Sequence, residues 1–283
     1  VNTNSGNTAV GASALMANTI GGYQVAVGNQ ALKACTTGVS NTAVGADAAD
    51  AVTTGGYNTV LGWEALTACT TGEKNTAVGA EALEAVTTGS DNCALGYIAL
   101  RAVTTGNDNI GIGKWAGQKI TTGSNNIAIG DQALYNLTDA GENIAIGKEA
   151  LYGLPAGNEN QCNVAIGSEA LKSQTTDDFR YFVAIGHHAM KDHNSAAQNS
   201  GSTAVGAFAM QNITTGDRNA AFGKNALNNG TTASYNAIFG TYAGQELTTG
   251  SRNTLVGHYA GRRLETAGSN VAIGYHALAG TSG

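Results

Sequence analysis

A glycine recurs along this chain at a nearly constant spacing, and the residues around each copy are alike. The pattern is seen in residues 75–89, which read NTAVGAEALEAVTTG. The glycines that close the NTAVG-like part of each copy are Gly11, Gly28, Gly45, Gly62, Gly79, Gly96, Gly113, Gly130, Gly147, Gly167, Gly186, Gly206, Gly223, Gly240, Gly257 and Gly274. Twelve of the fifteen intervals are 17 residues, and the other three are 20, 19 and 20. A short fixed period predicts a solenoid, because one repeat cannot bury its own apolar face and must stack on its neighbours.

The repeat runs through all 283 residues with no break in composition, which predicts one repeat solenoid domain over residues 1–283. Aromatic residues make up 6% of the chain, whereas glycine occurs 40 times. Cohesion must therefore come from close packing of small residues and backbone. The first residues read like the loop before a repeat, and the last stop partway through one. We therefore expect the chain to be a fragment of a longer protein.

Four residues before each closing glycine, asparagine stands in thirteen of the sixteen copies. In a stacked parallel array, such asparagines predict a structural ladder of side-chain amides that bond to the coils on either side. Members of this predicted ladder include Asn7, Asn41, Asn58, Asn75, Asn126, Asn163 and Asn270.

The three residues between the ladder position and the closing glycine predict a short strand. The first is β-branched in most copies, the second is usually alanine, and the third is always large and apolar. We expect the third residue to point inward and the alanine face to approach another surface closely. After the glycine, Ala-Leu and a further apolar residue follow at a spacing that suits about two helical turns. The sequence thus predicts a mainly β roll of sixteen coils, each with one strand and either a short helical turn or a second short strand.

The three longer copies lie together in residues 148–206 and predict surface insertions, which in solenoids often carry binding. Aromatic residues beside Asp and Arg in one insertion are typical of a carbohydrate-contacting surface. The candidate receptor-binding residues are Asp177, Asp178, Phe179, Arg180, Tyr181 and His193. The alternative is that Phe179, Tyr181 and Phe182 cover a bulge or fill a subunit interface.

Several classes of function lack support in the sequence. The net charge of -6, without a basic cluster, argues against nucleic-acid binding, and no apolar stretch is long enough for membrane insertion in this segment. No nucleophile with a positioned base and no cofactor fingerprint is found, so we expect no catalytic residue and no cofactor. His187, His188 and His193 are the one candidate metal group, but adjacent strand residues point to opposite faces and we expect surface histidines. We expect Cys35 and Cys69 to be buried apolar core residues.

The strings at residues 163–170 and 270–277, NVAIGSEA and NVAIGYHA, resemble the NSVAIG head repeat of YadA-like trimeric autotransporter adhesins. The longer unit, NTAVGxxAL followed by TTG, resembles repeats of phage tail-fibre and related trimeric fibre proteins. The resemblance implies a homotrimer of left-handed parallel β-rolls that is exposed outside the cell or on a virion and works in attachment. The 17-residue period is longer than that of the adhesin head repeats.

These observations predict a non-enzymatic trimeric attachment fibre, a phage tail-fibre shaft or receptor-binding region that contacts a host-surface glycan or receptor. The alternatives are a bacterial trimeric adhesin head at the cell surface and a structural extracellular filament. An ice-binding solenoid would need evenly spaced hydroxyls, and adjacent threonines in Thr-Thr leave only one usable row. A polysaccharide depolymerase built across chains is a further hypothesis.

Overall fold

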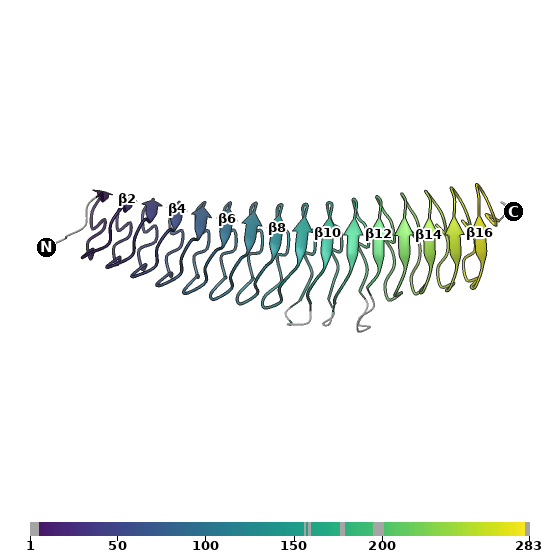
Figure 1. The fold of residues 1–283 in the computed structure, drawn as a ribbon. Coiled ribbons are helices and arrows are strands. Elements are labelled where there is room, and N and C mark those ends of the chain that lie inside the picture. The colour runs from purple at the N-terminus through teal and green to yellow at the C-terminus, as the bar shows by residue number, and fades with distance from the viewer. Residues whose placement is uncertain (1–5, 156, 158–159, 176–178, 195–200, 281–283) are drawn as a thin grey trace. The chain divides into compact units, whose positions relative to one another are not determined.

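The computed structural model describes residues 6–155, 157, 160–175, 179–194 and 201–280. Within these residues the chain forms sixteen three-residue strands, one in each repeat, and no helix (Figure 1). The chain divides into two compact units, Val1–Asp139 and Ala140–Gly283, which are described separately. The division falls between two repeats of the same pattern, and the single-domain assignment stays a prediction.

The first unit is a stack of parallel strands in which every residue pairs with the same repeat position of the next coil. Thr76, for example, pairs with Cys93, and Val78 pairs with Leu95. The strands of this unit are β1 (Thr8–Val10), β2 (Val25–Val27), β3 (Thr42–Val44), β4 (Thr59–Leu61), β5 (Thr76–Val78), β6 (Cys93–Leu95), β7 (Ile110–Ile112) and β8 (Ile127–Ile129). The predicted parallel β-solenoid is confirmed.

The second unit keeps the same register even where its repeats are longer. Val164 pairs with Val183 across a 19-residue interval, and Val183 pairs with Thr203 across a 20-residue interval. Its strands are β9 (Ile144–Ile146), β10 (Val164–Ile166), β11 (Val183–Ile185), β12 (Thr203–Val205), β13 (Ala220–Phe222), β14 (Ala237–Phe239), β15 (Thr254–Val256) and β16 (Val271–Ile273). The extra residues therefore lie outside the strand pairing.

The closing glycine lets neighbouring coils approach closely. All sixteen have φ between +126° and +154°, a conformation that side-chain-bearing residues rarely adopt. A Cβ placed on Gly79 would also lie 2.4 Å from the carbonyl oxygen of Gly96 in the next coil. The position excludes any side chain for two independent reasons, which explains why the glycine recurs.

The strand faces are the reverse of the sequence prediction. In every strand after β1 the middle residue is buried, whereas the residue before the closing glycine is half-buried or exposed. The interior is narrow, and residue size is matched across it. The alanine in the middle of the strand usually faces the leucine four residues after the closing glycine. Where Gly244 replaces that leucine, the middle strand residues beside it are the larger Ile238 and Leu255. Ala therefore lies inside because the coil is thin.

The segment after the closing glycine is a series of tight turns, so neither of the two alternatives, a short helical turn or a second short strand, forms there. The second and fourth residues after the glycine have positive φ in every coil, as in Glu81 (56°) and Leu83 (53°). Such residues interrupt a right-handed helix. Their backbone hydrogen bonds instead reach the neighbouring coils: the N–H of Glu81 donates to Trp63 O in the preceding coil at 3.0 Å, and the N–H of Leu83 donates to Ala99 O in the next coil at 3.1 Å. Hydrogen bonds between coils and burial of the leucine offset the strained conformation.

Candidate functional site

An apolar surface runs along the outer side of the strands in each unit. We call it the strand face and define it as the first and third residues of strands β1–β8 and of strands β9–β16. The third residue is Val, Leu, Ile or Phe in all sixteen strands. Leu61 is 49% exposed and Leu95 is 47% exposed, and no described residue covers them. In the second unit Phe222 and Phe239 stack on this face with ring centroids 4.9 Å apart. A repeated apolar surface of this kind marks a contact surface.

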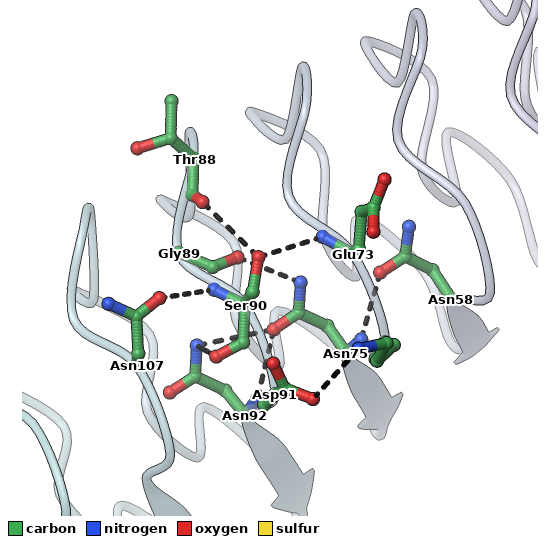
Figure 2. Close-up of polar contacts among 10 residues, drawn as sticks. Asn58, Glu73, Asn75, Thr88, Gly89, Ser90, Asp91, Asn92 and Asn107 are labelled. Carbon is green, nitrogen blue, oxygen red and sulfur yellow. Dashed lines mark hydrogen bonds and ion pairs between the residues drawn. The ribbon is translucent and has the colours of Figure 1, made fainter.

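The asparagines beside the strand face form a ladder of hydrogen bonds between coils. Figure 2 shows three successive members in the first unit, Asn58, Asn75 and Asn92. Asn75 Oδ1 accepts the backbone N–H of Asn92 at 3.1 Å, and Asn75 Nδ2 donates to Gly89 O at 2.9 Å. Asn75 is fully buried, so these amides satisfy backbone groups that would otherwise lack partners. The ladder serves the structure and leaves no polar group for a ligand.

An aromatic cluster replaces the ladder in the longer coils of the second unit. Phe182 takes the place of the asparagine and stacks on Phe179 with ring centroids 4.0 Å apart and planes 9° apart. His193 packs on Phe182 at 4.7 Å. We call Phe179, Phe182 and His193 the aromatic stack. Asn163 still reaches it, because its Oδ1 accepts the N–H of Phe182 and its Nδ2 donates to Phe179 O.

The structure separates the predicted receptor-binding residues. Phe179 and His193 are 0% exposed, so their assignment to a receptor-contacting surface is corrected: they fill the inside of the coil. Tyr181 is 53% exposed and Arg180 is half-buried, so these two remain candidates. Asp177 and Asp178 lie outside the described residues. The alternative that Phe179 and Phe182 fill a bulge agrees with their burial.

Two polar side chains, one of them a member of the aromatic stack, are buried in the longer coils of the second unit. Gln174 and His193 occupy the seventh position after the closing glycine, where the neighbouring coils carry Leu154 and Ile213. Both are fully buried, and among the described residues their side-chain nitrogens and oxygen have no hydrogen-bond partner. Burial lowers the pKa of His193 to about 4, and the nearby Thr214 backbone opposes this shift only in part. His193 is therefore neutral at pH 7.

The histidine pair lies differently from the expectation. His187 and His188 do not point to opposite faces, because His188 has a φ of 56° and lies in a turn after the strand. Their rings stack at 3.7 Å, and both meet the Phe208 ring edge-on. Within the described part of the chain, no group of three His, Cys, Asp or Glu residues is arranged to hold a metal ion. Cys35 and Cys69 are free and buried, which confirms their assignment to the core.

The Thr-Thr-Gly turns present one exposed row of threonines. The first threonine of most turns is partly buried, and its hydroxyl donates to the next coil, as from Thr53 to Thr70 O at 3.0 Å. The second threonine, such as Thr71 or Thr88, is exposed. One narrow row is a poor match for an ice surface, and the first row is already used within the fold.

Charged residues after the closing glycine form ion pairs between coils. In the first unit Arg101 pairs with Glu84 and Glu81. In the second unit Glu169 pairs with Lys191 at 2.6 Å, and this contact lowers the pKa of Glu169 below its usual range. These cations are neutralised within the fold, and such half-exposed pairs contribute little to stability.

A different arrangement of charge was missed by the sequence analysis. Arg218, Tyr235 and Arg252 occupy the fifth position before the closing glycine in three successive coils, and all three are exposed. The guanidinium carbons of Arg218 and Arg252 lie 5.4 Å and 5.9 Å from the Tyr235 ring centroid. We call these residues the arginine strip. The available signal was the 17-residue spacing of Arg, Tyr and Arg at one repeat position.

The chain matches no protein-family model and no curated protein. No helix in the described part of the chain is long and apolar enough to cross a membrane. The geometry of the strand face, the ladder and the arginine strip therefore carries the functional argument.

Proposed function

We propose that the chain is part of a non-enzymatic, homotrimeric attachment fibre. The observation that carries the proposal is the strand face, which in each unit is a row of half-buried or exposed Val, Leu, Ile and Phe side chains. The proposed number of copies, three, comes from the resemblance to tail-fibre and adhesin head repeats. In this arrangement, the strand faces of three copies meet around a common axis.

The physical chemistry of the strand face favours assembly. Moving a half-exposed leucine or isoleucine fully out of water contributes about 1 kcal/mol. With one such side chain per coil, the eight coils of either unit contribute several kcal/mol from their third strand positions alone. Because the coil is thin and its interior holds mainly Ala and Leu, a second apolar surface of this size gives a cohesion that the single coil lacks.

A fibre of this type would work outside the cell. We place it on a virion as a tail-fibre shaft or receptor-binding region, with a host-surface glycan or receptor as the partner. A bacterial adhesin head and a structural filament share the same architecture and differ in whether, and what, the surface binds. The exposed arginine strip and Tyr181 favour a surface that binds.

The test is the mass of the chain in solution, measured by light scattering. We expect a mass near three times 28.4 kDa. The double variant Leu61→Asp/Leu95→Asp places three buried charges, one from each chain, at each of two levels of the proposed interface and should reduce the mass to that of one chain. The matched control is Thr71→Asp/Thr88→Asp, which adds the same charge at exposed turn positions and should leave the trimer intact.

A monodisperse monomer for the unaltered chain would refute the homotrimer. An intact trimer that fails to bind host cells would refute the attachment role and favour a structural filament. Binding is measured with fluorescently labelled protein on intact cells, with the monomeric double variant as the reference for loss of multivalent attachment.

A further inference from the structure

We propose that the arginine strip binds an acidic polysaccharide, whose carboxylate or sulfate groups are held by Arg218 and Arg252. The inference rests on the proposed attachment function and names the class of its ligand. It also moves the expected ligand site away from the aromatic stack, which is buried, to an exposed surface over strands β13, β14 and β15.

The backbone holds the strip in place before any ligand arrives. All three residues have positive φ, between 55° and 61°. The N–H of Tyr235 donates to Asp217 O at 3.0 Å, and the N–H of Arg252 donates to Ser234 O at 3.1 Å. These bonds fix Tyr235 and Arg252 relative to the preceding coil. Binding therefore orders fewer degrees of freedom than it would on a flexible loop.

The contacts with Tyr235 leave hydrogen-bond donors free. Arg218 and Arg252 lie near the Tyr235 ring, with guanidinium carbons 5.4 Å and 5.9 Å from its centroid, and each guanidinium carries five N–H groups. One of them, on Arg218 Nη1, donates to the Tyr235 hydroxyl. The others can donate two parallel hydrogen bonds to two oxygens of a carboxylate or sulfate, which is the bidentate geometry that arginine favours.

The two arginines differ from Arg101, Arg262 and Arg263, each of which has a carboxylate partner. Arg101 pairs with Glu84, and both Arg262 and Arg263 pair with Glu246. Within the described part of the chain, neither Arg218 nor Arg252 makes an ion pair. The same repeat position in the first unit carries Lys74, but Asp91 in the next coil lies 4.0 Å from it. The arginine strip therefore presents two cations that form no ion pair among the described residues, although Asp217 directly precedes Arg218 in the sequence.

The spacing of the strip selects an extended chain with repeated charges. Arg218 and Arg252 stand two coils apart, which is roughly 10 Å at the usual separation of paired strands. A polysaccharide with an anionic group on alternate sugars can meet both arginines while it lies along the stack. Hydroxyl-bearing Ser234 and Ser251 directly precede Tyr235 and Arg252 and suit the polar surface of a sugar chain. Nucleic acid fits less well, because two cations on a chain of net charge -6 cannot follow a dense run of phosphates.

The experiment measures binding of the whole chain to immobilised heparin, to a polyuronate and to neutral dextran at low and physiological salt. We expect binding to one or both acidic polymers, weakening with salt, and none to dextran. Comparing the affinities for heparin and for the polyuronate shows whether sulfate or carboxylate is preferred. Arg218→Gln/Arg252→Gln should lower the affinity by at least about tenfold, since it removes the charge-assisted hydrogen bonds of both arginines to the anionic groups.

Two controls keep the result specific. Lys74→Gln removes one cation from the equivalent position in the first unit and should leave the affinity unchanged, because that lysine already faces Asp91. Arg218→Lys keeps the charge but loses the planar donor pair, and we expect a smaller loss than for the glutamine variant. Unchanged binding by the Arg218→Gln/Arg252→Gln variant, or equal binding of single-stranded DNA, would overturn the inference.

Mass is measured by light scattering on the same samples, so the two proposals can fail separately. A trimer that shows no preference for acidic polymers refutes the arginine strip as a ligand site and leaves the fibre standing. A monomer that binds heparin through Arg218 and Arg252 refutes the homotrimer and retains the site.

Discussion

The two units solve the same packing problem with different side chains. In the first unit, asparagines at the ladder position bridge successive coils, as Asn75 does between Gly89 and Asn92. In the second unit the ladder is interrupted at Phe182, and the aromatic stack fills the space. The strand register is nevertheless the same on either side of the interruption, with Val164 opposite Val183.

This difference shows which parts of the repeat are required. The closing glycine and the paired strand occur in every coil, so they define the solenoid. The ladder position accepts either an amide with hydrogen-bond partners or a ring with packing partners. Insertions are tolerated where the chain leaves the strand pairing, because they change neither the glycine contact nor the register.

The largest effect is expected from the closing glycine, where the two units should respond alike. Gly79→Ala in the first unit would place a methyl 2.4 Å from Gly96 O, and Gly206→Ala in the second would place one 2.6 Å from the Gly223 carbonyl. Together with the positive φ, each should lower the free energy of unfolding by more than about 4 kcal/mol. Chemical denaturation followed by circular dichroism measures the loss.

Gly274→Ala separates the two causes in that prediction. Gly274 has the same kind of backbone conformation, with φ 126°, but an added methyl would approach only Ala277 Cβ, at 3.9 Å. We expect it to cost about 1–3 kcal/mol from backbone strain alone. If Gly206→Ala were as mild as Gly274→Ala, the claim that both units depend on close approach of the coils would be wrong.

Smaller losses of stability are expected from one substitution in the ladder and one in the aromatic stack. Asn75→Ala should cost about 3–5 kcal/mol, because it leaves the buried Asn92 N–H and Gly89 O without partners. Phe182→Asn restores the common residue of the repeat but should also destabilise the fold, because it opens a cavity against Phe179 and supplies an amide with no matching ladder neighbour in Ser202. Thermal unfolding of both variants gives the comparison. If Phe182→Asn left the stability unchanged or raised it, the aromatic stack would contribute no more stability than an asparagine of the ladder.

Much of the fold could be predicted because the repeat position encodes it. Counting from the closing glycine locates every strand and its register. The apolar pattern did not show which face of each strand is buried, since Ala and the flanking Val or Ile are all apolar and a three-residue strand alternates only once. The missed signal was size matching across the interior, with Ile238 and Leu255 appearing where Gly244 replaces a leucine.

The tight turns were not among the two alternatives, a helical turn and a second strand, because apolar residues spaced three apart suit a helix as well as tight turns. Gly117, Gly244 and Gly261 in the leucine position were the available signal, because glycine readily adopts the positive φ that this position has in every coil. The candidate site was affected by a similar error. Phe179 and His193 were assigned to an insertion, although their distances from the closing glycine place them at core positions of the repeat.

Lowering the pH should destabilise the aromatic stack and leave the asparagine ladder unaffected. His193 has a pKa lowered to about 4 by burial, against about 6.5 when unfolded, so the unfolded chain binds more protons between these values. Stability is therefore highest above about pH 6.5, falls by about 3 kcal/mol as the pH drops to 4, and changes no further from this group below that. Denaturation midpoints measured across this range give the slope.

His193→Leu is the matched variant, because leucine occupies the same repeat position at Leu154 and Leu247. It should remove most of the loss between pH 6.5 and pH 4 while leaving other titrations in place. His188, whose pKa is also lowered by burial and by His187, is present in both proteins and cancels in the difference. The carboxyls of Glu149 and Glu169, with pKa values lowered by lysine contacts, lose their contribution only towards the acid end of the range. An identical pH profile for the two proteins would show that His193 is hydrated or paired, and that the aromatic stack is no more sensitive to acid than the ladder it replaces.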